Sequence, residues 1–196
     1  NKKELIMKVL FVQPPHYFDG KFRRAGFFPV GLGYLTNRLL EEGHEVEVLD
    51  IWANQISDED LVRVIPNLEY DVVGITALST QYNYVKWLAQ QLKRHNDKPI
   101  VVGGPLATFS PEIVLKHMQV DICVLSEGDI SFPNLVNNLG EPEKVNGIVY
   151  LKNSEVAHTA AQEYVRDLDS LGFATRDRNI FATDIYIQNG YLDGHP

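Results

Sequence analysis

Short runs of aliphatic and β-branched residues alternate with amphipathic segments along most of this chain, and that alternation limits the folds it can adopt. The apolar runs lie at 8–12, 45–50, 71–76, 99–102 and 121–125. Apolar residues recur at helical spacing in the segments 29–42, 58–67, 82–95, 111–118 and 130–139. Strands that alternate with helices through short connections favour a parallel sheet with right-handed crossovers and helices on both faces.

The prediction is an α/β fold of the flavodoxin-like (Rossmann-like) type, with a doubly wound sheet of five parallel strands. The expected strand order is 2-1-3-4-5, which places a ligand crevice beyond the carboxyl ends of the strands. Residues 16–28 are aromatic and basic, with glycines that interrupt any periodicity, and they predict a long loop.

The pattern changes after Pro142, where the helix-and-strand alternation stops. The segment 147–157 is typical of a β-hairpin that turns at Asn153-Ser154. Residues 163–196 have weak periodicity and predict an extended arm or linker. We therefore expect one domain at 1–142, and a hairpin appendage with a linker at 143–196.

Composition narrows the class of protein. The formal net charge is −8 with no Lys/Arg-rich block, which argues against nucleic acid as a partner. Cys123 is the only cysteine, so the chain has no internal disulfide or cysteine cluster. No apolar run approaches the roughly 18 residues of a membrane span, and no signal-peptide pattern opens the sequence. We expect a soluble cytoplasmic protein with no membrane contact.

The carboxyl ends of parallel strands meet at one edge of a sheet, so the loops that follow the strands gather there. These loops hold most of the suggestive polar and small residues, at 13–16, 76–80, 103–105 and 126–129. Gly103 and Gly104 follow a strand expected to be buried on both faces. Either they form a tight turn that needs positive φ, or they remove side chains from the path of a ligand.

Other residues in these loops have two possible roles. The hydroxyl of Thr76 either bonds a neighbouring carbonyl or faces a ligand slot, because a buried hydroxyl needs a partner. Ser79 and Thr80 are expected first as helix N-caps and only second as ligand contacts. Asp129 is also expected as an N-cap.

No catalytic or metal-binding set emerges from the sequence. His16 is interpreted as a packing or surface residue, since no second ligand stands at metal-binding spacing from it. Cys123 falls in the middle of a predicted strand and is expected in the core. The chain shows no nucleophile with an adjacent base, so we assign no catalytic residue.

With these residues in place, the chain resembles the cobalamin-binding domain at the N-terminus of many radical S-adenosylmethionine proteins. The resemblance extends from about residue 9 to 171, and its specificity lies in the ordered set rather than in one motif. The segments that carry it are Gln13-Pro14-Pro15, 29–35, Gly43-His44-Glu45-Val46 with Asp50, 71–76, 101–105 with Ala107-Thr108, Glu127-Gly128-Asp129 and 166–171.

The resemblance implies that cobalamin lies on the carboxyl edge of the sheet, with its nucleotide tail beside the fourth strand. Gly103 and Gly104 would clear that tail, and Thr76 with Leu78 matches the Ser/Thr-x-Leu element that contacts the benzimidazole. The cofactor-binding residues that we predict are Gln13, Pro14, Pro15, Thr76, Leu78, Ser79, Gly103, Gly104, Pro105, Glu127 and Gly128.

Two motifs of related proteins are missing from this sequence. The D-x-H-x-x-G motif, which supplies a histidine to cobalt in the methyltransferase and mutase relatives, is absent, so the resemblance implies base-off binding without a histidine ligand. The C-x-x-x-C-x-x-C motif of radical enzymes is absent too. A 4Fe-4S cluster and S-adenosylmethionine would therefore belong to a barrel joined to this chain in a full-length methyltransferase or cyclase. Alternatively, the chain is a stand-alone binding module.

Two other functions stay open. The turn Gly43-His44-Glu45-Val46 before a strand also occurs in the N-terminal halves of two-domain glycosyltransferases. A degenerate domain that binds no corrinoid and only packs against a partner is the second alternative.

Overall fold

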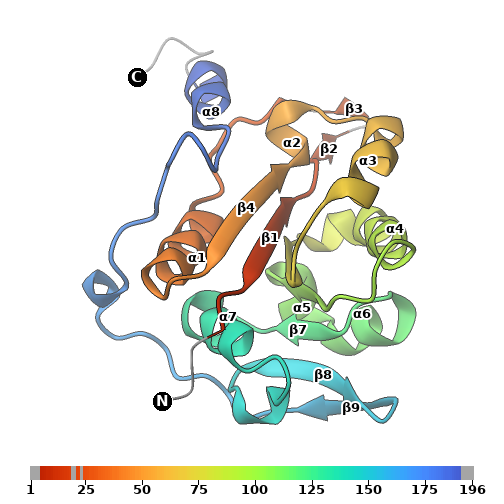
Figure 1. The fold of residues 1–196 in the computed structure, drawn as a ribbon, viewed down its shortest axis with the longest axis vertical. Helices are drawn as coiled ribbons and strands as arrows, with labels where there is room; N and C mark the ends of the chain where they lie inside the picture. The colour runs from red at the N-terminus through yellow and green to blue at the C-terminus, as the bar shows by residue number, and fades with distance from the viewer. Residues whose placement is uncertain (1–4, 19–20, 23, 191–196) are drawn as a thin grey trace.

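The computed structural model describes residues 5–18, 21–22 and 24–190, and its main sheet confirms the predicted strand order. Five parallel strands lie in the order β4-β1-β5-β6-β7, and Figure 1 labels β4, β1 and β7 among them. Their bounds are Glu45–Asp50 for β4, Lys8–Gln13 for β1, Val72–Thr76 for β5, Ile100–Gly103 for β6 and Ile122–Val124 for β7.

The prediction of five strands is wrong, because the C-terminal hairpin joins the same sheet. β8 (Ile148–Lys152) pairs antiparallel with β7, and β9 (Glu155–His158) pairs with β8. The main sheet of the described residues thus has seven strands. An edge strand such as β7 offers unpaired backbone groups, and the hairpin satisfies them. The division into domains at residue 142 stays a prediction.

Helices cover both faces of the sheet, as a doubly wound fold requires. One face carries α3 (Asp58–Val64), α4 (Tyr82–Lys93), α5 (Pro105–Phe109) and α6 (Pro111–His117). The other face carries α1 (Val30–Glu41) and α7 (Gly128–Asn137). Side chains of β1 alternate between them, because Leu10 and Val12 join the first core while Val9 and Phe11 join the second.

Two segments differ from the predicted loop and linker. Within the predicted loop at 16–28, β2 (Tyr17–Phe18) and β3 (Lys21–Phe22) form a small antiparallel pair, while residues 19–20 and 23 lie outside the described residues. The predicted extended arm contains a 3-10 turn (Leu168–Leu171) and the helix α8 (Thr183–Gly190). α8 packs beside the short helix α2 (Ile51–Asn54), a tertiary contact that periodicity cannot reveal. Residues 191–196 lie outside the described residues.

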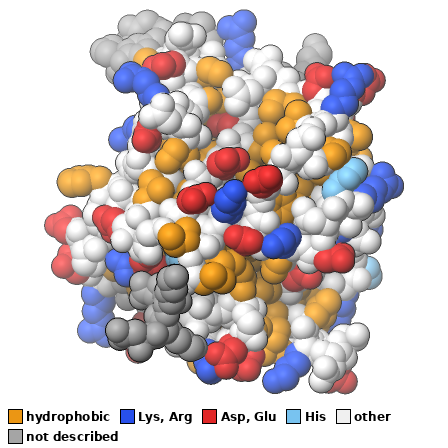
Figure 2. Space-filling model, viewed as in Figure 1, with side chains coloured by type: hydrophobic (Ala, Val, Ile, Leu, Met, Phe, Trp, Pro, Cys, Tyr) orange, Lys and Arg blue, Asp and Glu red, His pale blue; other side chains and the backbone are white. Residues whose placement is uncertain are grey.

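The described surface mixes both signs of charge on the face shown in Figure 2. Lys and Arg side chains lie among Asp and Glu there, and they form no continuous basic patch on this face. None of the helices in the described part of the chain has the length and apolar character needed to cross a membrane.

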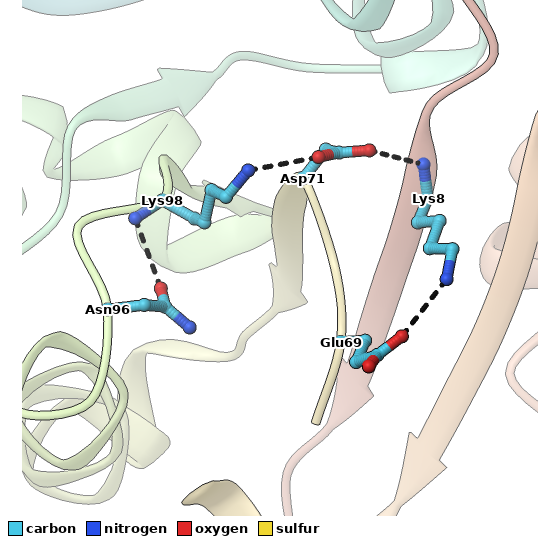
Figure 3. Close-up of polar contacts among 5 residues, drawn as sticks. All are labelled: Lys8, Glu69, Asp71, Asn96 and Lys98. Carbon is cyan, nitrogen blue, oxygen red and sulfur yellow. Dashed lines mark hydrogen bonds and ion pairs between the residues drawn. The ribbon is translucent and has the colours of Figure 1, made fainter. Parts of the chain in front are cut away.

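The amino ends of the strands are tied together by Asp71, which stands just before β5. One oxygen of its carboxylate accepts the backbone N–H of Lys8 at 2.9 Å, and the other accepts Lys98 Nζ at 3.0 Å. Lys8 Nζ in turn lies 3.1 Å from a Glu69 oxygen, and Lys98 N–H donates to Asn96 Oδ1 at 3.1 Å (Figure 3). This network fixes the strands at the sheet edge opposite the predicted site.

We expect Asp71→Asn to lower the free energy of unfolding by about 1 kcal/mol at pH 7, because a charged acceptor of two hydrogen bonds is lost. The Lys8 N–H bond and then Lys98 hold the pKa of Asp71 below its ordinary 3.8. A carboxyl with a depressed pKa contributes stability above its unfolded pKa and loses it as pH falls through the folded pKa.

Urea unfolding of the wild type and of Asp71→Asn between pH 7 and pH 2.5 tests this expectation. The stability difference between the two proteins should shrink at the acid end, and the exposed Asp97→Asn should behave like the wild type. A difference that is constant over the whole range would contradict an electrostatic role for Asp71.

Candidate functional site

A slot opens at the carboxyl ends of β5 and β6, on the face covered by α1 and α7. It contains about 420 Å³ of empty space, which includes solvent at its mouth. Most of its lining is apolar, and its residues are Phe11, Leu32, Leu35, Gly74, Ile75, Thr76, Val101, Gly103, Gly104, Val124, Ser126, Gly128 and Phe132. An apolar slot with a few polar groups at its edge is typical of a small-molecule site.

Gly103 is open to the slot and has no structural reason to be glycine. A Cβ placed on Gly103 would have no neighbouring atom within 4 Å among the described residues, and its φ is not left-handed. An alanine would therefore fit at this position without strain. The missing side chain leaves space in the slot, as the ligand reading of this glycine predicts.

Gly104 is glycine for a different reason, which is the shape of the backbone. Its φ of +79° and ψ of −169° belong to a region that only glycine occupies readily. A Cβ there would lie 2.9 Å from the carbonyl oxygen of Ala77, the same oxygen that accepts the N–H of Leu106. The turn interpretation therefore holds for Gly104. Gly103 leaves open space in the slot, and a ligand in that space stays a prediction.

The floor of the slot is aromatic. The rings of Phe11 and Phe132 lie with their centroids 5.1 Å apart. They pack over Gly74 in β5, where a Cβ would come within 2.8 Å of the Phe11 ring. Gly74 therefore allows the two rings to cover the strand, and its absent side chain shapes the slot from below.

The polar groups at the slot are hydroxyls. Thr76 lines it, and no hydrogen bond joins its hydroxyl to another described residue, which favours the slot reading over a bond to a carbonyl. Ser126 also lines the slot; the sequence placed it in a loop at this edge, but it is not among the predicted binding residues. It has a φ of +56° and is held there by its N–H bond to Thr108 Oγ1 at 2.9 Å. No sequence signal marks a left-handed serine.

The predicted binding residues fall into three groups, the third of which is the first loop with Gln13, Pro14 and Pro15. Thr76, Gly103, Gly104 and Gly128 line the slot together. Leu78, Ser79, Pro105 and Glu127 are exposed outside it, at the same edge of the sheet. Glu127 lines a separate hollow beneath residues 162–165. Contact of this exposed group with a cofactor stays a prediction.

The first loop, residues 13–16, is joined to the loop after β5 by one side chain. Gln81 Nε2 donates to the carbonyl oxygen of Pro15 at 2.9 Å, and Gln81 Oε1 accepts the N–H of Leu78 at 2.8 Å. Pro14 and Pro15 are buried. Gln13, Pro14 and Pro15 therefore brace the edge of the sheet, although they do not line the slot.

Two N-cap predictions are wrong. Ser79 and Thr80 lie in a 3-10 turn before α4, because the longer Gln81 side chain reaches back to the N–H of Leu78. Asp129 lies in the first turn of α7, one residue past Gly128, where a carboxylate still complements the helix dipole. Burial, and after it the charge of Glu127, raises the pKa of Asp129.

His16 packs among aromatic rings, as predicted. Its ring centroid lies 4.2 Å from that of Trp52 and 5.8 Å from that of Phe27. Burial lowers the pKa of His16, so its ring is neutral near pH 7. Within the described ranges no three His, Cys, Asp or Glu side chains gather as a metal-binding group.

Cys123 lies in the core, as predicted, because β7 is covered on both faces. Its side chain is buried, and that burial raises the pKa of the thiol to about 12. A thiol with so high a pKa is neither a nucleophile nor a metal ligand at neutral pH.

Comparison with known proteins identifies the family. The family model of the B12 binding domain matches residues 25–136, and this chain belongs to that family. It is 31% identical over 179 residues to an uncharacterized methyltransferase of Pyrococcus horikoshii, covering 88% of this chain and 39% of the relative. It is 28% identical to the anaerobic magnesium-protoporphyrin IX monomethyl ester cyclase of Cereibacter sphaeroides, covering 84% of this chain and 28% of the cyclase.

Solved structures share the fold. The radical S-adenosylmethionine methyltransferase TsrM from Kitasatospora setae, with cobalamin and a [4Fe-4S] cluster bound, matches with a TM-score of 0.67 and 20% identity. The match covers 84% of this chain and 30% of TsrM. The cobalamin-dependent radical enzyme OxsB with aqua-cobalamin matches with a TM-score of 0.66 and 20% identity, over 81% of this chain and 23% of OxsB. This chain thus spans less than two fifths of these curated relatives.

We expect Gly104→Ala to lower the stability of the cofactor-free protein by about 1–3 kcal/mol, because alanine is strained at this φ and ψ. Gly103→Ala should change stability by less than about 1 kcal/mol, since its Cβ meets open space. Urea unfolding of both variants without cofactor is the measurement. Equal losses at the two positions would show that the two glycines do not have different structural roles.

Proposed function

We propose that this chain is the cobalamin-binding domain of a radical S-adenosylmethionine methyltransferase or cyclase, and that it holds the corrinoid base-off. Membership in the B12 binding domain family supports the cofactor. The observation that carries the proposal is the open space at Gly103, in an apolar slot at the sheet edge where α/β folds bind ligands. The backbone conformation accounts for a glycine at position 104. No contact or backbone angle of the described residues requires a glycine at position 103.

The slot suits a flat, mainly apolar ring such as the benzimidazole at the end of the nucleotide tail. Phe11 and Phe132 offer aromatic surface, and Leu32 and Leu35 of α1 close the side opposite the strands. Thr76 and Ser126 provide hydroxyls near the mouth for the polar part of the tail. When bound, cobalamin supplies the cobalt chemistry, while these residues supply binding and orientation.

Two considerations support base-off binding without a histidine ligand. A tail inserted in the slot takes the lower base away from cobalt. His16 is the histidine of the first loop, and its ring is held between aromatic side chains and 3.5 Å from Gln13 Nε2. We therefore assign His16 to packing rather than to cobalt.

The rest of the enzyme lies beyond this chain in our proposal. The curated relatives are about two and a half to three and a half times as long as the matched region. A radical S-adenosylmethionine barrel joined in cis would hold the 4Fe-4S cluster and S-adenosylmethionine. The exposed residues Leu78, Ser79, Pro105 and Glu127 would then border the corrinoid on the side of this domain.

Replacing Gly103 tests the proposal most simply. We expect Gly103→Val to weaken hydroxocobalamin binding by a hundredfold or more, because three carbons would take space that the bound nucleotide tail fills. Its melting temperature should stay near that of the wild type, since a Cβ at this position meets no atom within 4 Å. Equilibrium dialysis with hydroxocobalamin, beside thermal unfolding of the same samples, gives both quantities.

Gly140→Val is the matched control, because Gly140 also has open space around its Cβ but lies outside the slot. It should bind as the wild type does. A folded Gly103→Val protein with wild-type affinity would remove the slot from the cofactor site. Absence of binding by the wild type itself would favour a degenerate domain that only packs against a partner.

A further inference from the structure

We infer that the C-terminal segment 174–190, here called the strap, holds the first loop in its binding conformation, with Tyr186 as the positioning residue. This inference rests on the proposed function, since the loop borders the cofactor edge. Neither the strap nor Tyr186 lines the slot, so any influence of Tyr186 on cofactor binding has to pass through intermediate side chains.

Tyr186 makes a buried hydrogen bond to β4. Its hydroxyl donates to Asp50 Oδ2 at 2.6 Å, and Asp50 is 1% exposed. The other carboxylate oxygen of Asp50 accepts the N–H of Ala53 at 2.8 Å, which starts α2. Burial and the neighbouring Asp50 raise the pKa of Tyr186, so the phenol remains a donor throughout the working pH range.

The strap crosses α1 before it reaches Asp50. Thr175 N–H donates to the carbonyl oxygen of Gly33 at 3.1 Å. The two segments are so close that a Cβ placed on Gly33 would lie 2.9 Å from the carbonyl oxygen of Thr175. The guanidinium carbon of Arg176 lies 5.4 Å from the Phe28 ring centroid. Figure 1 shows the strap as the blue segment that passes α1 and ends in α8 beside α2.

Aromatic contacts lead from α8 to the first loop. Tyr186 and Trp52 are buried in one small cluster, with ring centroids 6.3 Å apart. Trp52 is the ring on which His16 packs at 4.2 Å. His16 Nε2 lies 3.5 Å from Gln13 Nε2, at the end of β1.

From the first loop, Gln81 continues the connection to the slot. It bonds the carbonyl oxygen of Pro15 and the N–H of Leu78, which stands two residues after Thr76. The strap, α2, the first loop and the loop after β5 are therefore in contact as one series. Packed series of this kind can couple distant sites, and the coupling has to be measured.

Loss of the Tyr186 hydroxyl would remove one hydrogen bond from the buried Asp50 carboxylate. α2 and Trp52 would then be less firmly held, and the first loop would have to be ordered at the moment of cofactor binding. We expect Tyr186→Phe to weaken hydroxocobalamin binding about fivefold or more, at the lower end of couplings between separate sites.

The experiment compares Tyr186→Phe with Tyr164→Phe, the same substitution at an exposed position of the tail. Two quantities are measured: hydroxocobalamin affinity, and amide hydrogen exchange of residues 13–16 and 50–54 without cofactor. Tyr186→Phe should lose affinity and speed exchange in both segments, and Tyr164→Phe should change neither. A double mutant with His16→Ala should lose little more affinity than His16→Ala alone, because both substitutions break the same series.

A lower melting temperature with unchanged affinity, and faster exchange confined to α8, would overturn the inference and leave Tyr186 a purely structural residue. If the affinity losses of Tyr186→Phe and His16→Ala added fully in the double mutant, the coupling from Tyr186 to the first loop would not pass through Trp52 and His16. Failure of the wild type and of Tyr164→Phe to bind hydroxocobalamin would contradict the proposed function instead. In that case the exchange measurement still decides whether the strap orders the first loop.

Discussion

The slot depends on three glycines in β5 and at the end of β6, each of which does something different. Gly74 lets Phe11 and Phe132 cover β5, and Gly103 leaves the end of β6 bare toward the slot. Gly104 then turns the chain in a conformation that a side chain would strain. A close-packed interior has few voids larger than a water molecule, so a slot that enters the apolar layer between the sheet and α1 is an uncommon feature. The proposed position of the cofactor in this chain depends on that opening.

The two edges of the sheet have different physical characters. At the amino edge, Asp71 accepts a backbone N–H of β1 and a lysine ahead of β6, and this network closes the strand ends. At the carboxyl edge, the strands end in glycines, hydroxyls and an apolar slot. The closed edge holds the strands in register, so that the open edge keeps its shape without a ligand. A preformed site of this kind reduces the ordering cost of binding.

The sequence was sufficient for the strand order, because alternating periodicity and right-handed crossovers leave few topologies. The sequence also located the paired glycines, but it could not show that they have different roles. The positive φ of Gly104 and the open space beside Gly103 are properties of the folded chain. Side chains that line the slot from other elements, such as Phe132 and Ser126, carry no local signal. The sequence did not predict α8, because this helix is held by a hydrogen bond between Tyr186 and Asp50, which lie far apart in the sequence. His44, whose turn also suggested a glycosyltransferase, is placed by the Met7 N–H and by Asn137 in the folded chain.

Electron paramagnetic resonance of the cobalt(II) form of the protein–cobalamin complex tests base-off binding most directly. Cobalt bound to a lower base or to a histidine shows superhyperfine splitting from the coordinated nitrogen, and cobalt without such a ligand does not. With the benzimidazole in the slot and His16 packed on Trp52, we predict a spectrum without nitrogen splitting. Splitting from an axial nitrogen in the bound complex would contradict that assignment.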